Sequence, residues 1–134
     1  MLAVVFASAG VLHFVKPEPY EMIMPPQLPY PLELIYISGV AEIVGGLGVL
    51  SPRVRPWAGL WLIGVLVAVF PANVYHAFAA EDLAGNPVPQ PALFARLPLQ
   101  ALLIAWVWQA TEPSLIRTRR RRLGRAREAL RRRR

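Results

Sequence analysis

The sequence contains no cysteine, which excludes disulfide bonds, thiolate metal sites, iron–sulfur clusters and dithiol redox chemistry. Charge is also scarce over most of the chain. Eleven of the fifteen Lys and Arg residues follow Pro113, so the net charge of +7 belongs to the C-terminal tail. The body carries only Lys16, Arg53, Arg55 and Arg96 as basic residues, and seven acidic ones.

Apolar residues are abundant, at 55% of the chain with a mean hydropathy of +0.39, which favours a bilayer as the solvent. Charges and prolines divide the body into four apolar runs, at residues 1–15, 32–50, 57–75 and 93–110. A membrane span needs roughly 20 apolar residues, so the first run is short and the others fit. No positively charged segment precedes the first run, so we interpret it as a membrane helix and not as a signal peptide.

The predicted fold class is therefore all-α. Residues 1–112 are expected to form a four-transmembrane-helix antiparallel bundle, because none of the runs shows the alternation that membrane β-strands require. Residues 16–31 contain six prolines and cannot form one regular helix, although residues 19–24 could form an interfacial turn carrying Tyr20. Residues 51–56 predict a tight connection, and residues 76–92 an extended external loop.

Orientation follows from the positive-inside bias of short loops and helix ends. Arg53, Arg55 and the eleven tail arginines lie on one side, against Lys16 and Arg96 on the other. The sequence therefore predicts a multi-pass protein of the plasma (cytoplasmic) membrane, the inner membrane of the cell, with both termini in the cytoplasm.

Seven polar residues lie in or beside the predicted spans, all toward their outer ends when depth is counted at about 1.5 Å per residue. They form the candidate ligand-binding pocket: His13, Ser38, Glu42, Asn73, His76, Arg96 and Gln100. Ionisable groups inside a membrane are costly and commonly mark a functional site. The alternative is structural, since Ser, Asn, Gln and His also hydrogen-bond between membrane helices without any ligand.

Glu42 is the deepest of these residues, roughly 15 Å from the surface and near the midplane. We expect it to pair with Arg96, or failing that with His13 or Asn73, and to form the floor of a pocket that opens outward. Pro71 removes a backbone hydrogen bond one turn before Asn73, so a kink there could shape the pocket or serve packing alone.

The tail, residues 113–134, forms the second predicted segment. Ile116, Leu123 and Leu130 recur every seven residues among arginines, which indicates a basic interfacial helix on anionic lipid head groups. Arginines could also bind nucleic acid, but tethering to the membrane holds lipid at a much higher effective concentration. We therefore expect lipid and membrane proteins as partners, and no nucleic acid.

Five segments of the chain resemble the DoxX-like family of small four-helix integral membrane proteins. They are residues 10–17 (GVLHFVKP), 25–26 (PP), 28–29 (LP), 37–46 (ISGVAEIVGG) and 70–76 (FPANVYH). The resemblance runs through Trp108 and covers all but the tail. It implies the four-helix fold and a link with quinol oxidase or other redox systems; without cysteine, this chain departs from any thiol-based role.

Three classes of function remain open from the sequence. The first is an accessory subunit of a membrane redox system whose outer pocket takes a quinone head group; the others are a ligand-free scaffold and a small-solute or proton carrier. We expect no catalytic activity of its own, no metal and no resident cofactor, with quinone as the candidate ligand. His13 and His76 could face one another across a haem, but they lie near the interface and nothing else indicates a porphyrin cavity.

Overall fold

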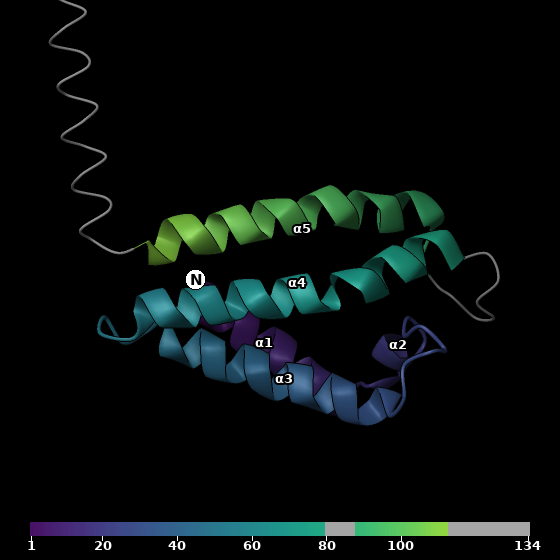
Figure 1. Ribbon diagram of the computed structural model, residues 1–134, viewed down its shortest axis with the longest axis horizontal. Coiled ribbons are helices and arrows are strands. Elements are labelled where there is room, and N and C mark those ends of the chain that lie inside the picture. The colour runs from purple at the N-terminus through teal and green to yellow at the C-terminus, as the bar shows by residue number, and fades with distance from the viewer. Residues whose placement is uncertain (80–87, 113–134) are drawn as a thin grey trace, which may run out of the picture.

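The structure, a computed structural model, describes residues 1–79 and 88–112, and this part of the chain is all-α. Five helices follow one another: α1 (Leu2–Val15), α2 (Glu18–Glu21), α3 (Pro31–Gly48), α4 (Arg55–Ala79) and α5 (Gln90–Thr111). The four longer helices run antiparallel to their chain neighbours, and α2 lies at the end of the bundle opposite the α3–α4 connection (Figure 1). The expected antiparallel helical bundle is thus observed.

Three helices, α3, α4 and α5, are long and apolar enough to cross a membrane. The apolar helix α1 has 14 residues and reaches about 21 Å, short of a hydrocarbon core of about 30 Å. The outward surface is rich in large apolar side chains such as Val44, Leu60, Val67 and Leu102, which suggests that the helices face lipid. The chain is therefore a small helical protein with three candidate membrane spans and a shorter apolar N-terminal helix.

The third connection is shorter than the sequence predicted. Helix α4 continues through His76 to Ala79, and α5 already begins at Gln90, so the expected loop at residues 76–92 was drawn too long. Pro91 does not prevent this early start, because in the first turn of a helix its missing N–H has no intrahelical partner to lose. The predicted interfacial helix in residues 113–134 lies outside the described residues.

Helix α3 packs against both α1 and α4, and α5 packs against α4. The approach of α1 to α3 depends on two facing glycines: a Cβ atom on Gly39 would lie 2.8 Å from the His13 Cβ and 2.9 Å from the Gly10 carbonyl oxygen. At the end of the bundle farther from α2, Leu62 and Val107 are fully buried in the apolar core. This packing leaves the end nearest α2 as the part where polar side chains gather.

Candidate functional site

A cavity of about 620 Å³ lies between the helices at the α2 end of the bundle. Its lining includes every one of the seven residues singled out from the sequence: His13, Ser38, Glu42, Asn73, His76, Arg96 and Gln100. The rest of the wall is largely apolar and includes Leu66, Val69, Leu99 and Leu103. The structure therefore brings the predicted residues to one place, and their role in binding a ligand stays a prediction.

On one side of the cavity, His13 of α1 is held against α3. Its Nδ1 atom lies 3.0 Å from the Ile35 carbonyl oxygen and 2.9 Å from the Ser38 hydroxyl, which itself donates to the Ile35 carbonyl at 2.8 Å. The Gly10–Gly39 contact makes this possible, because it lets the backbones of α1 and α3 approach one turn away. His13 is only 6% exposed and is thus fixed in place by its neighbours.

On the opposite side, Gln100 of α5 is bonded to two groups of α4. Its amide nitrogen donates to the Leu66 carbonyl oxygen, and its side-chain oxygen accepts a hydrogen bond of 2.9 Å from Asn73. The helix carries Pro71 between these two partners, and a proline inside a helix loosens the backbone bonds of the preceding turn. Gln100 therefore joins α5 to α4 on both sides of Pro71 and orients the Asn73 amide.

Glu42 of α3 lines the same cavity and has no hydrogen-bond partner for its Oε2 atom among residues 1–79 and 88–112. Its side chain is 8% exposed, and its Oε2 atom is buried without any hydrogen bond to the described part of the chain. The expected pairing with Arg96 is wrong, because no ion pair joins these two side chains within residues 1–79 and 88–112. The cause lies in the packing: Arg96 is exposed on α5, which packs on α4, whereas Glu42 is buried in α3.

The short helix α2 covers the cavity, and its contribution was missing from the sequence-based site. Tyr20 packs on His13 with ring centroids 4.0 Å apart. Burial raises the pKa of the Tyr20 hydroxyl, the nearby Glu42 carboxylate raises it further, and the Arg96 guanidinium lowers it. The signal available in the sequence was the proline-bounded turn at residues 19–24, which we had placed at the interface and not over the site.

His76, the second histidine, lies in the last turn of α4, is buried and lines the same cavity as His13. It belongs to the site because α4 extends past the predicted loop boundary. The described residues contain no group of three or more His, Asp and Glu side chains that could hold a metal ion.

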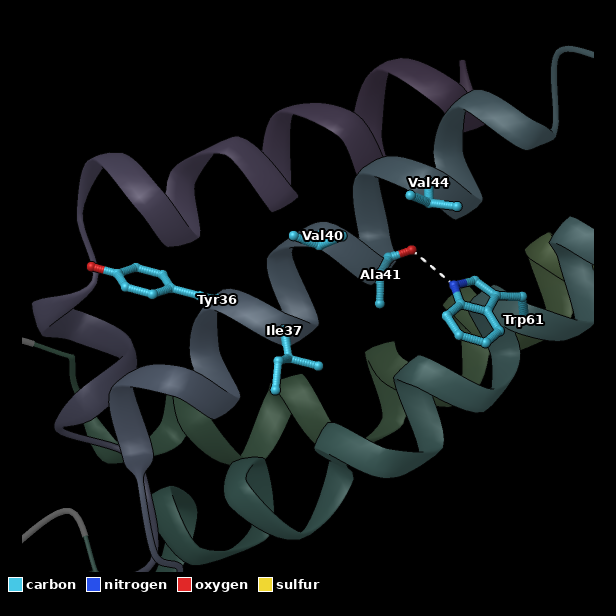
Figure 2. A pocket seen from close by; sticks show the side chains of 6 residues that line it. All are labelled: Tyr36, Ile37, Val40, Ala41, Val44 and Trp61. Atoms are coloured by element: carbon cyan, nitrogen blue, oxygen red, sulfur yellow. Dashed lines mark hydrogen bonds between the residues drawn. The ribbon is translucent and has the colours of Figure 1, made fainter.

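A second hollow, of about 350 Å³, lies on the outer surface of α3 and α4 (Figure 2). Its lining is almost wholly apolar and consists of Tyr36, Ile37, Val40, Ala41, Val44 and Trp61. The Trp61 indole nitrogen donates a 2.9 Å hydrogen bond to the Ala41 carbonyl oxygen, which ties α4 to α3 at one end of the groove (Figure 2). No residue is shared with the cavity, and the groove offers little polar chemistry.

The fold and the cavity define a small all-α protein with candidate membrane spans built around an internal, partly polar chamber. The chain belongs to the family described as a domain of unknown function, DUF8561, whose model matches residues 2–111. No curated protein and no solved structure matches the chain. This comparison shows DUF8561 and not the DoxX-like family, so the likeness to the latter stays a resemblance.

Proposed function

We propose that the bundle binds a small amphipathic, lipid-soluble molecule of the quinone class in the cavity, as an accessory subunit of a membrane redox system. The observation that carries the proposal is the buried, unpartnered Glu42 carboxyl group in a chamber of about 620 Å³. Ligand pockets are typically about 300–1,000 Å³, mostly apolar, with a few polar groups that orient the ligand. The wall of this cavity has that composition.

The structural alternative accounts for some of the polar residues but not for Glu42. Gln100, Asn73, His13 and Ser38 do hydrogen-bond between helices, as polar residues in a scaffold would. A buried acid that forms no hydrogen bond between helices does not stabilise a scaffold, and its burial lowers the stability of the fold. Glu42 therefore favours a ligand, which would supply the missing partner.

The proposal includes a membrane orientation. Arg53 and Arg55 lie in or beside the α3–α4 connection, at the end of the bundle opposite α2 and the cavity (Figure 1). With the arginine-rich end in the cytoplasm, both termini are cytoplasmic and the cavity opens in the outer half of the bilayer. A lipid-soluble ligand would then enter from the bilayer or from the outer surface beside α2.

Binding to purified protein in lipid nanodiscs tests the function. The probe is a benzoquinone with one isoprenoid unit, measured in its oxidised and its reduced state, with empty nanodiscs as the baseline for partitioning. We expect saturable binding of at least one state, weakened on the order of tenfold by Glu42→Met through loss of one charge-assisted hydrogen bond. The matched control is Glu33→Met, since Glu33 is exposed on the same helix and does not line the cavity.

The same two variants separate a ligand site from a structural residue. Removing an unpartnered buried acid should leave the melting temperature of the ligand-free protein unchanged or higher, because an apolar side chain of similar length has no desolvation cost. A lower melting temperature for Glu42→Met, with no binding of either redox state to the wild type, would leave the scaffold as the function that fits.

A further inference from the structure

The hydrogen bonds around the cavity determine which polar atoms are left to meet a ligand. A backbone carbonyl can only accept, so the His13 Nδ1 atom, 3.0 Å from the Ile35 carbonyl oxygen, must carry a hydrogen. A neutral imidazole has one N–H group only. In the neutral ring the His13 Nε2 atom is therefore a hydrogen-bond acceptor.

The same reasoning holds on the other wall. The Leu66 carbonyl oxygen can only accept, so it is the amide nitrogen of Gln100 that faces it and the Gln100 oxygen that faces Asn73. Asn73 must then present its amide nitrogen to Gln100. What remains of the Asn73 side chain is its carbonyl oxygen, Oδ1, which is again an acceptor, and the second hydrogen of its amide nitrogen.

Glu42 adds a third acceptor. Its Oε2 atom is buried and makes no hydrogen bond with the described residues, and a side chain that is 8% exposed has little contact with bulk water. A carboxyl group keeps an accepting oxygen whether it is ionised or neutral. His13 Nε2, Asn73 Oδ1 and Glu42 Oε2 thus place three acceptors on the lining of the cavity, and Glu42 Oε2 is a buried one without a hydrogen bond to the described residues.

The charged donors lie nearer the surface. Lys16 and Arg96 line the cavity but are exposed, and the half-buried Tyr20 hydroxyl is within electrostatic reach of Arg96 and of Glu42. With Glu18 as the one acidic residue among the exposed polar groups of the lining, this rim carries a net positive charge. A positive rim disfavours the entry of an organic cation.

From this arrangement we infer that the cavity selects a ligand that enters as a hydrogen-bond donor, namely a neutral ring hydroxyl of the phenol or hydroquinone class. The hydroxyl points toward Glu42, His13 and Asn73, and the apolar part of the molecule lies against Leu66, Val69 and Leu103. The inference rests on the proposed function and sharpens it: of a quinone–hydroquinone pair, the reduced and hydroxylated member binds more tightly.

A ligand pair without redox chemistry tests this polarity. 4-Nonylphenol and its methyl ether, 4-nonylanisole, have the same ring and tail, but the ether has lost the hydroxyl hydrogen. In neutral-lipid nanodiscs corrected with empty discs, we expect the phenol to bind on the order of tenfold more tightly. Glu42→Met should bring the ratio of the two dissociation constants close to one, and Glu33→Met should leave it unchanged.

The outcomes separate the inference from the proposed function. Equal binding of phenol and ether, together with saturable quinone binding, overturns the donor inference and leaves the function standing. Tighter binding of nonylammonium than of nonylphenol also overturns it, because the ligand would then be a cation. Absence of saturable binding for all of these probes and for both redox states of the quinone overturns the proposed function itself.

Discussion

At the scale of single residues, the site combines two kinds of polar side chain. Asn73, Gln100, His13 and Ser38 hold helices together through defined hydrogen bonds, and the same bonds decide which of their atoms remain available. The Glu42 Oε2 atom makes no such hydrogen bond with the described residues. The first four residues hold the helices around the cavity, whereas the Glu42 carboxyl group is the one whose hydrogen-bonding capacity a ligand would satisfy.

Two double-mutant cycles measure that distinction. Asn73→Ala and Gln100→Ala should be non-additive in the free energy of unfolding, because they remove one shared hydrogen bond of a size that averages about 0.6 kcal/mol and reaches about 1.7 kcal/mol in membrane bundles. Glu42→Met and Arg96→Met should be additive within about 0.5 kcal/mol, since no ion pair joins them. Reversible unfolding in detergent provides the measurement.

A coupling of more than about 1 kcal/mol between Glu42 and Arg96 would show that the pair does form in the bilayer. It would restore the ion pair that the sequence suggested and would remove the unpartnered acid on which the proposed function depends.

At the scale of secondary-structure elements, the position of the site depends on how closely α1 approaches α3. Gly10 and Gly39 face one another where the two helices meet, and neither place can be taken by a larger residue without moving one helix away from the other. Since His13 lies on the facing side of α1, a shift of α1 moves the histidine relative to Ile35 and Ser38. Packing of two apolar helices thus positions a polar group.

Substitution of two helical glycines tests this dependence. Gly39→Ala should destabilise the bundle by about 1–3 kcal/mol, because the new methyl group would lie 2.8 Å from the His13 Cβ. Gly64→Ala is the matched control: apart from its own turn of α4, the described chain places no atom within 4 Å of its Cβ position, so the better helix propensity of alanine should make it neutral or stabilising by up to about 1 kcal/mol. Thermal unfolding in detergent and ligand binding in nanodiscs are the readouts, and equal behaviour of the two variants would contradict the close packing.

Helix boundaries show how far sequence patterns reach at this scale. The apolar runs predicted the four long helices to within a few residues at most ends, because a hydrophobic stretch of that length has few other structures open to it. The error at the α4–α5 connection came from using prolines as boundaries. A proline in the first turn of α5 costs no helical hydrogen bond, and Pro71 and Pro98 lie inside α4 and α5 without ending them.

At the scale of the whole molecule, the remaining prediction concerns orientation in the membrane. The arginines at the α3–α4 connection and in residues 113–134 should keep both ends of the chain in the cytoplasm. An alkaline-phosphatase fusion after Arg134 should therefore be inactive and one within residues 81–91 active, with the opposite pattern for a reporter that works only in the cytoplasm.

Replacing Arg53 and Arg55 by glutamine tests whether the positive charge of the α3–α4 connection sets the orientation. If loop charge sets the topology, the double variant should show mixed activity of the internal fusion, whereas Glu18→Gln should not, because acidic residues contribute little to this bias. An active alkaline phosphatase at Arg134 in the unmodified chain would reverse the orientation and place the cavity in the cytoplasmic half.

What could be determined from the sequence alone is the all-α class of the molecule and the height of its polar residues along the helices. Both follow from one-dimensional quantities: the length of the apolar runs, and the rise of about 1.5 Å per residue that converts sequence position into height along a helix. For that reason all seven singled-out residues line one cavity.

Only the tertiary structure decided which of these residues touch. Contact depends on how each helix is rotated about its axis and which neighbour it packs against, and these are set by close contacts such as Gly10 with Gly39, far apart in the sequence. For this reason the pairing of Arg96 with Glu42 was predicted incorrectly and the Asn73–Gln100 hydrogen bond was not predicted. Tyr20 was left out of the site for a related reason. A short helix between prolines can fold over the bundle or away from it, and contact with His13 places α2 over the bundle.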